Sequence, residues 1–221
     1  MEEMRQHAGL QKNNFIYKNT VTYNYSKEYE QLKNIYKKLH KEGTSLESAE
    51  NIFDGKSLKF FFKAIKQVIT ITNSKSIIDF GCGKAKYYFE EVLIENKKYN
   101  NIQSYWDIDN ITLYDPGYRK FQTYPNKILD GVICVDVVEH IPEADVEKFI
   151  EEIFSLATKF VFIVIACYPA KKYLPDGRNV HLSIKKPGEW QRIISKVKKI
   201  HPTINPFVIC SETRKKFVTI S

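Results

Sequence analysis

One short segment of the sequence, Asp79-Phe80-Gly81-Cys82-Gly83, places an acidic residue and two glycines directly after an apolar, β-branched run. Glycine lets a backbone turn tightly and approach a ligand without a Cβ clash. The segment is not a dinucleotide fingerprint, which requires a third glycine where Lys86 stands. A carboxylate two residues before the first glycine repels a pyrophosphate and suits a positive charge. The turn therefore predicts a site for a cationic ligand at the end of a strand.

Two more acidic residues stand at the ends of predicted strands. Asp115 follows the apolar run 111–114, and Asp136 ends the nearly apolar run 131–136, just before Glu139 and His140. The carboxyl ends of parallel strands lie at one edge of a sheet, where α/β proteins bind ligands. We therefore expect these acidic residues to share one site with the glycine turn.

The three motifs, in this order, resemble those of the class I S-adenosylmethionine-dependent methyltransferases. The glycine turn looks like their first motif, D/E-x-G-x-G, and Asp115 looks like the acidic residue that holds the ribose hydroxyls. The segment Asp130–Ile141 looks like their fourth strand and the LEH-type turn after it. The resemblance covers residues 76–167 and implies S-adenosyl-L-methionine as cofactor, which carries an ammonium and a sulfonium but no phosphate. The residues that it assigns to the cofactor are Asp79, Gly81, Cys82, Gly83, Asp115, Pro116 and Asp136.

The chain departs from that pattern in its spacing. The usual third glycine is Ala85, and Asp115 stands 36 positions after Asp79, where about 20 is typical. The insert Asn96–Asn110 explains the length and leaves Asp107 and Asp109 as alternative ribose ligands. Because Asp130 follows Asp115 so soon, we expect the family's third strand and its helix to be shortened or missing. The segment Leu39–Gly43, together with the loop after Cys167, also resembles a group of uncharacterised bacterial and phage methyltransferases, which adds fold and cofactor but no substrate.

Two histidines are candidate catalytic bases. His140 follows the fourth strand of the resembling proteins, near the transferred methyl, and a neutral imidazole can accept a proton from a hydroxyl or an amine. His181 lies in a polar, turn-rich loop that leaves the same edge of the sheet, and either histidine could instead be structural. The candidate substrate-binding residues of that loop are Tyr168, Lys171, Arg178 and Asn179.

The net charge of +8 is concentrated near the C-terminus. Residues 171–221 contain 12 Lys or Arg and 3 Asp or Glu, a net of +9, whereas residues 1–170 contain 22 and 23, a net of −1. A local excess of positive charge predicts an anionic partner, and we expect a small acceptor such as a phosphorylated metabolite or a glycan precursor. The D/N-P-P-Y/F motif of amino-methylating DNA enzymes is absent after the fourth strand. RNA modification and a non-catalytic cofactor-binding module remain the alternatives.

Composition excludes several classes of protein. With 43% hydrophobic and 27% charged residues the chain is globular rather than disordered, and its longest apolar stretch, residues 160–168, is far shorter than the roughly 20 residues of a membrane span. The polar N-terminus does not look like a signal peptide, so we expect reduced cysteines and a cytoplasmic location. No His or Cys cluster has zinc spacing, and the sequence predicts no metal site. It gives no indication of the oligomeric state.

Alternation of strands and helices predicts an α/β, Rossmann-like fold. It has a mostly parallel sheet, helices on both faces, a C-terminal antiparallel hairpin and a helical N-terminal extension. Residues 1–72 are expected to form an N-terminal arm and helices on the substrate side, and residues 73–221 the Rossmann-like domain. The first predicted helix has an apolar face from Tyr25 to Leu39 and ends at Gly43, and the second is capped by Ser57. The other predicted helices are Lys84–Glu95, Glu143–Ala157 and Pro187–Lys199. The predicted strands are Ser76–Phe80, Ile111–Tyr114, Gly131–Asp136, Phe160–Cys167, Pro206–Cys210 and Lys216–Ile220.

Overall fold

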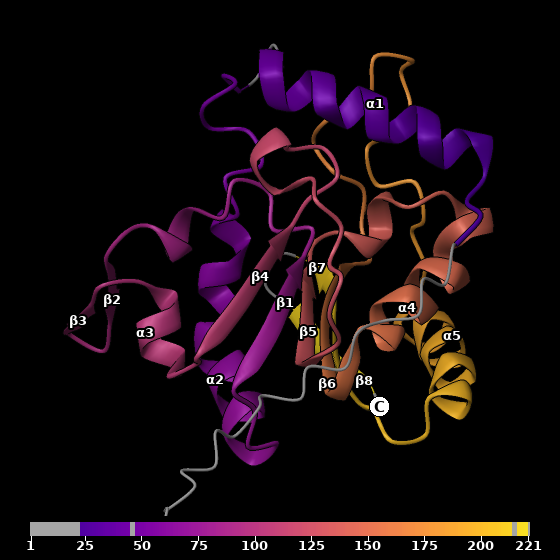
Figure 1. Cartoon of the computed structure of the whole chain (residues 1–221). Helices are drawn as coiled ribbons and strands as arrows, with labels where there is room; N and C mark the ends of the chain where they lie inside the picture. Colours follow the sequence, from indigo (N-terminus) through magenta and orange to yellow (C-terminus); the bar gives the residue numbers. More distant parts are fainter. Residues whose placement is uncertain (1–22, 45–46, 214–215, 221) are drawn as a thin grey trace, which may run out of the picture.

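The computed structural model describes residues 23–44, 47–213 and 216–220, so the predicted arm over residues 1–22 lies outside the described residues (Figure 1). The central sheet has the strand order β4-β1-β5-β6-β7-β8. Neighbouring strands are parallel from β4 to β7, and β8 is antiparallel to β7. This arrangement confirms the predicted Rossmann-like α/β fold with its C-terminal hairpin. The strands are β1 (Ser76–Phe80), β4 (Asn110–Tyr114), β5 (Leu129–Val135), β6 (Ala157–Ala166), β7 (Asn205–Thr213) and β8 (Lys216–Ile220).

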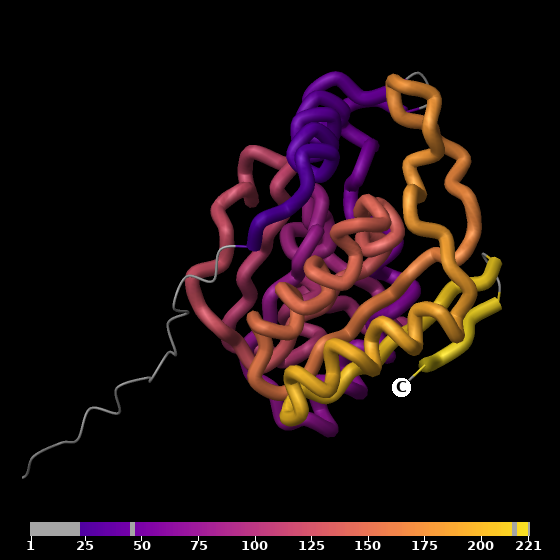
Figure 2. The backbone as a smooth tube through the Cα atoms, turned by 90° about the vertical axis from the view of Figure 1, so that its right-hand side faces the viewer, coloured from indigo at the N-terminus to yellow at the C-terminus, as the bar shows by residue number. Residues whose placement is uncertain are grey.

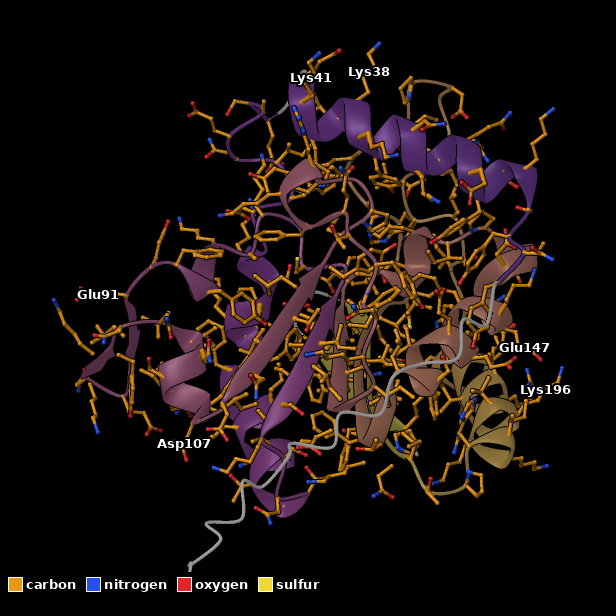
Figure 3. All side chains as sticks on the ribbon, in the orientation of Figure 1. Lys38, Lys41, Glu91, Asp107, Glu147 and Lys196 are labelled. Atoms are coloured by element: carbon orange, nitrogen blue, oxygen red, sulfur yellow. The ribbon has the colours of Figure 1, made fainter. Side chains whose placement is uncertain are left out.

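Both faces of the sheet are covered by helices. Helices α4 (Val146–Ser155) and α5 (Pro187–Ile200) pack on one face, and α2 (Phe62–Ile71) and α3 (Ile102–Trp106) belong to the core on the other. Successive strand residues point to opposite faces, and Ile77 and Ile78 accordingly belong to different core clusters. This double burial explains why the central strands lack a polar side. Glu147 of α4 and Lys196 of α5 form an ion pair 2.6 Å long, and Figure 3 labels both side chains where the two helices meet.

Helix α1 (Lys27–Glu42) lies across the carboxyl ends of the strands (Figure 1). It begins where the Ser26 hydroxyl accepts a hydrogen bond from the backbone N–H of Tyr29, and it ends at Gly43, whose φ of +77° suits glycine. The long segment after β6, residues 167–186, rises to meet this helix (Figure 2). Leu32 of α1 packs there against Leu174 and Val180. The N-terminal helix and this segment therefore cover the edge at which the site was predicted.

The helix predicted over Lys84–Glu95 is wrong. The structure has a short 3-10 turn, η2 (Lys86–Tyr88), followed by the antiparallel pair β2 (Val92–Ile94) and β3 (Lys97–Tyr99). Ala85 adopts a left-handed conformation, with φ +55°, and interrupts any helix there. Leu93 is 68% exposed between two buried neighbours, and Phe89, expected to point inward, is 58% exposed. Val92 and Leu93, which suggested a helical face, instead point to opposite sides, as successive residues of a strand do.

Other boundaries differ by smaller amounts. Ser57 lies inside the 3-10 helix η1 (Lys56–Phe61) and caps no helix, because α2 starts only at Phe62. A 3-10 turn, η5 (Glu143–Asp145), precedes α4, and Ala157 is the first residue of β6 rather than the end of the helix. Between β4 and β5, all of whose residues are described, the regular element is the 3-10 turn η3 (Arg119–Phe121). This agrees with the expected loss of a third strand and helix.

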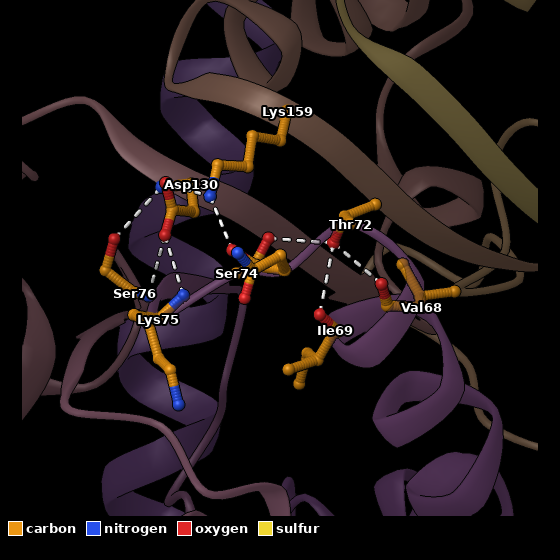
Figure 4. A network of polar contacts seen from close by, with 9 residues as sticks. Val68, Ile69, Thr72, Ser74, Lys75, Ser76, Asp130 and Lys159 are labelled. Carbon is orange, nitrogen blue, oxygen red and sulfur yellow. Dashed lines mark hydrogen bonds and ion pairs between the residues drawn. The ribbon is translucent and has the colours of Figure 1, made fainter.

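Polar side chains join the amino ends of the strands (Figure 4). Asp130 Oδ2 accepts hydrogen bonds from the backbone N–H groups of Lys75 at 2.7 Å and Ser76 at 3.3 Å. Its Oδ1 lies 3.2 Å from Nζ of Lys159, which also donates to the Asn73 carbonyl. This amino edge is thus held by a carboxylate whose two oxygens both have partners.

Candidate functional site

A cavity of about 760 Å³ opens at the carboxyl edge of the sheet, between the strand ends, α1 and the segment after β6. Cavities of roughly 300–1,000 Å³ are typical of small-molecule sites. Most residues predicted from the sequence line this one cavity. They are Asp79, Gly81, Cys82, Gly83, Asp115, Pro116, Asp136, His140, Tyr168, Lys171 and His181.

The glycine turn is packed tightly against two other segments. Gly81 has φ +87°, and an added Cβ would lie 2.4 Å from Cγ2 of Val137. Gly83 has φ +57°, and its Cβ would lie 2.2 Å from the backbone oxygen of Phe53. Glycine is therefore required here by the backbone conformation and by neighbouring protein atoms. This differs from the sequence-based reason, which was close approach to a ligand.

Asp79 is a buried carboxylate in the cavity wall, 4% exposed. Its Oδ2 accepts a hydrogen bond from the Tyr88 hydroxyl at 2.7 Å. Burial raises the pKa of Asp79 to about 7, although the Tyr88 hydrogen bond acts in the opposite direction. A cationic ligand beside this side chain would favour its charged form.

Asp115 is held by backbone amides on both sides. The N–H of Gly83 donates to its Oδ2 and the N–H of Gly117 to its Oδ1, each at 2.8 Å. Burial raises the pKa of Asp115, and these hydrogen bonds oppose the rise. The rival ribose ligands Asp107 and Asp109 precede β4 and so lie at the opposite edge of the sheet from the cavity. Figure 3 labels Asp107 there. Of the three aspartates, the structure brings Asp115 to the glycine turn.

Asp136 stands at the end of β5 with φ +55°. Burial raises its pKa, and a hydrogen bond with the side chain of Ser57 opposes that rise. Ser57, expected to cap a helix, thus lines the cavity next to a candidate cofactor residue.

His140 and His181 meet edge to face across the cavity wall, with ring centroids 4.9 Å apart. Nδ1 of His140 lies 2.8 Å from the Tyr36 hydroxyl, and Nδ1 of His181 lies 2.6 Å from the Tyr168 carbonyl oxygen. Burial lowers the pKa of His140 to about 3 and lowers that of His181 as well. Both imidazoles are therefore neutral at pH 7, which is the form that accepts a proton or binds a metal.

The predicted substrate loop reaches the cavity with only part of its residues. Tyr168 and Lys171 line it, whereas Arg178 and Asn179 do not. Arg178 forms ion pairs with Asp176 and Glu28 on the outer surface, and the Asn179 amide donates to the Ala170 carbonyl and so closes the loop on itself. Local partners hold both side chains away from this cavity, and their role in substrate binding stays a prediction.

The sequence-based reasoning missed several residues of the site. Tyr36 and His40 reach the cavity from α1, and Phe53 reaches it from the segment before η1. The His40 ring lies 4.9 Å from the Phe53 ring and 5.3 Å from that of Tyr118, and burial lowers the pKa of His40 to about 4. The segment Leu39–Gly43 contains His40 and was the signal in the sequence that could have pointed to it. It contributed only to the resemblance with uncharacterised methyltransferases and was not assigned to the site. Periodicity alone does not show on which part of the sheet a helix will dock.

Comparison with protein-family models, with curated proteins and with solved structures finds no match. Within the described part of the chain, no helix has the length and apolar character needed to cross a membrane. The fold and the site together define a Rossmann-like α/β protein with a cavity at the carboxyl edge of its sheet.

Proposed function

We propose that this protein is an S-adenosylmethionine-dependent methyltransferase acting on a small, anionic acceptor, a metabolite or a glycan precursor, in the cytoplasm. The observation that carries the proposal is the buried carboxylate of Asp79 in the wall of a large cavity, next to the glycine turn. A buried carboxylate without a cationic partner is costly, and a perturbed pKa in a cleft favours a functional site.

The residues at the cavity fit this cofactor. The Asp79 carboxylate suits an ammonium group, and no Lys or Arg contributes to its pKa shift. Asp115 uses one lone pair of each oxygen for the Gly83 and Gly117 amides. A carboxylate has about four acceptor positions, so Asp115 can still accept hydrogen bonds from ribose hydroxyls. His40, whose Nε2 lies 3.7 Å from Oδ1 of Asp115, and Phe53, whose ring lies 4.9 Å from that of His40, supply flat surfaces in the cavity wall.

Bound S-adenosylmethionine supplies an electrophilic methyl group on its sulfonium. The chain itself needs mainly to align the acceptor with that methyl and to exclude water. Helix α1 and the segment 167–186 provide the exclusion, because they close over the strand ends. His140 and His181 are neutral and lie in the wall, and either could accept the proton that a hydroxyl or amine acceptor loses.

The charge distribution supports a small anion more than RNA. Lys171 is exposed at the cavity, and Lys172, which also lines it, is ion-paired with Glu47. Several other cations of the basic C-terminal segment also have acidic partners. These pairs are Arg178 with Glu28, Lys185 with Glu143, Lys196 with Glu147, and Lys216 with Glu212. The acidic partners partly neutralise the positive charge of these side chains. The positive charge at the cavity is therefore local, which suits a compact acceptor.

Calorimetric titration of the full-length protein with S-adenosylmethionine tests the proposal. We expect binding at one site, and a loss of affinity of about 100-fold or more in Asp79→Ala because a charge-assisted contact disappears. Asp176→Asn, which changes an exposed aspartate outside the cavity, is the matched control and should bind like the wild type. The absence of binding by the folded wild type would refute the proposal. Gly81→Val is a poor test, because its Cβ would clash with Val137 whether or not a ligand binds.

A further inference from the structure

Three side chains with metal-binding atoms converge beside the cavity. Glu139 and His140 belong to the 3-10 turn η4 (Val138–His140) after β5, and His181 comes from the segment after β6. One carboxylate oxygen and one nitrogen from each imidazole lie within 4.8 Å of one another. Ligands at about 2.1 Å from one tetrahedral ion stand roughly 3.4 Å apart. A modest inward adjustment of the side chains would therefore bring all three onto one ion.

His181 is already oriented as a ligand would be. Its Nδ1 lies 2.6 Å from the Tyr168 carbonyl oxygen, and because a carbonyl only accepts, Nδ1 carries the proton. The other ring nitrogen, Nε2, consequently keeps its lone pair. Metal-bound histidines commonly donate their second N–H to a backbone carbonyl, which fixes the tautomer and the ring orientation.

His140 is fixed in a similar way. Its Nδ1 lies 2.8 Å from the Tyr36 hydroxyl. In the tautomer in which Nδ1 donates to that oxygen, Nε2 keeps its lone pair and is the atom available to a metal ion.

Glu139 supplies the independent observation that points to a ligand. Its side chain is fully buried, with 0% exposure. Oε1 accepts a hydrogen bond from the Ala166 N–H at 3.1 Å, but Oε2, also buried, has no hydrogen-bond partner. Leaving a buried carboxylate oxygen unpaired is costly. A cation next to Oε2 would remove that cost.

The surrounding charges suit a divalent cation. Asp136 lies close enough to raise the pKa of Glu139 and to act on His181. Lys172 contributes to lowering the pKa of His140, but it is ion-paired with Glu47. When Glu139 is ionised, two carboxylates and two neutral imidazoles carry a charge of −2, which one divalent ion balances.

We propose that Glu139, His140 and His181 bind one divalent first-row transition-metal ion, such as Zn²⁺, Mn²⁺, Fe²⁺ or Co²⁺. Two imidazoles and a carboxylate suit these ions better than Mg²⁺ or Ca²⁺, which prefer oxygen ligands throughout. His140 and His181 line the cavity, whereas Glu139 lies behind them. The remaining coordination positions therefore face the cavity, where they can take water or an anionic oxygen of a bound molecule. With an ion bound, the two histidines act as ligands rather than as bases.

This inference goes beyond the proposed function, and its test needs no S-adenosylmethionine. The full-length protein, freed of metal by chelation, is titrated with CoCl₂ and followed by calorimetry and by visible absorption. We expect one Co²⁺ to bind per chain and to show a visible ligand-field spectrum typical of Co²⁺ with nitrogen ligands. Because burial raises the pKa of Glu139, binding should release a proton, which two buffers of different ionisation enthalpy detect.

Substitution of the ligands completes the test. Glu139→Gln and His181→Ala should each weaken Co²⁺ binding by at least 100-fold, since even partners of the ligands commonly contribute 10–100-fold. Glu139→Gln removes no stabilising charge and should keep the melting temperature of the metal-free protein, so lost binding cannot be ascribed to unfolding. His201→Ala, at the far end of α5, is the matched histidine control and should bind Co²⁺ normally. The proposal is overturned by a wild type that binds no Co²⁺ at millimolar concentration, by ligand variants that bind it unchanged, or by an equal loss in His201→Ala.

Discussion

Acidic side chains at the two edges of the sheet lie in opposite environments. At the amino edge, Asp130 is partly exposed and both of its oxygens have partners, from two backbone amides and Lys159 (Figure 4). At the carboxyl edge, Asp79 is buried with a pKa of about 7, and Glu139 keeps an unpaired oxygen. The first arrangement stabilises the fold. The second costs stability and is a feature that only bound ligands would compensate.

The largest expected effect is at the amino edge. Asp130→Ala should lower the free energy of unfolding by about 2–3 kcal/mol, because the amides of Lys75 and Ser76 lose their acceptor and water replaces it only in part. Urea unfolding measures the change. Asp130→Asn, which keeps one acceptor oxygen, should lose about half as much. If Asp130→Ala unfolds at the wild-type urea concentration, the amino edge does not stabilise the fold in the manner described.

Asp79→Asn should have the opposite sign, stabilising the ligand-free protein by about 1–2 kcal/mol at pH 8. The pKa of Asp79 in the folded state, about 7, lies above its ordinary value of 3.8, so the folded state favours the neutral acid. Wild-type stability should therefore fall as the pH rises from about 4 to 7, and the fall should be smaller in the variant, in which residue 79 cannot ionise while the other buried carboxyl groups still do. Urea unfolding at pH 5 and pH 8 measures both chains. A variant that is less stable than the wild type at pH 8 would show that Asp79 is structural.

Binding of S-adenosylmethionine should depend on pH through the same carboxylate. If Asp79 must be ionised to hold the ammonium, a pKa of about 7 makes the dissociation constant roughly tenfold larger at pH 6 than at pH 8. Calorimetry across this range should also show proton release at pH 6. Ligand binding with equal affinity at pH 6 and pH 8 would separate Asp79 from recognition of the cation.

The sequence predicts the site best where its residues are fixed by strand ends. Asp79, Asp115 and Asp136 each follow an apolar run, and parallel strands necessarily bring such ends to one edge. The convergence of Glu139 with His181 depends on the path of a long loop, which periodicity does not encode. The failed helix over Lys84–Glu95 has another cause, since Val92 fits a helical face with Tyr88 and Phe89 as well as it fits a strand face with Ile94. Left-handed residues at Ala85 and at the Glu95–Asn96 turn decide between them.

The smallest effect should distinguish the cavity from the outer surface within the basic C-terminal segment. Lys171 lines the cavity, whereas Arg178 is held by Glu28 and Asp176 outside it. Lys171→Glu should lower transfer of label from S-adenosylmethionine to an acceptor fraction of a cell extract several-fold, because like charges repel an anionic acceptor over a short distance. Arg178→Glu makes the same change of charge and should stay within twofold of the wild type. Raising the salt concentration should shrink the difference, since exposed charges are screened. An equal loss in both variants would assign the effect to net charge and would favour a large polyanion such as RNA over a small acceptor bound in the cavity.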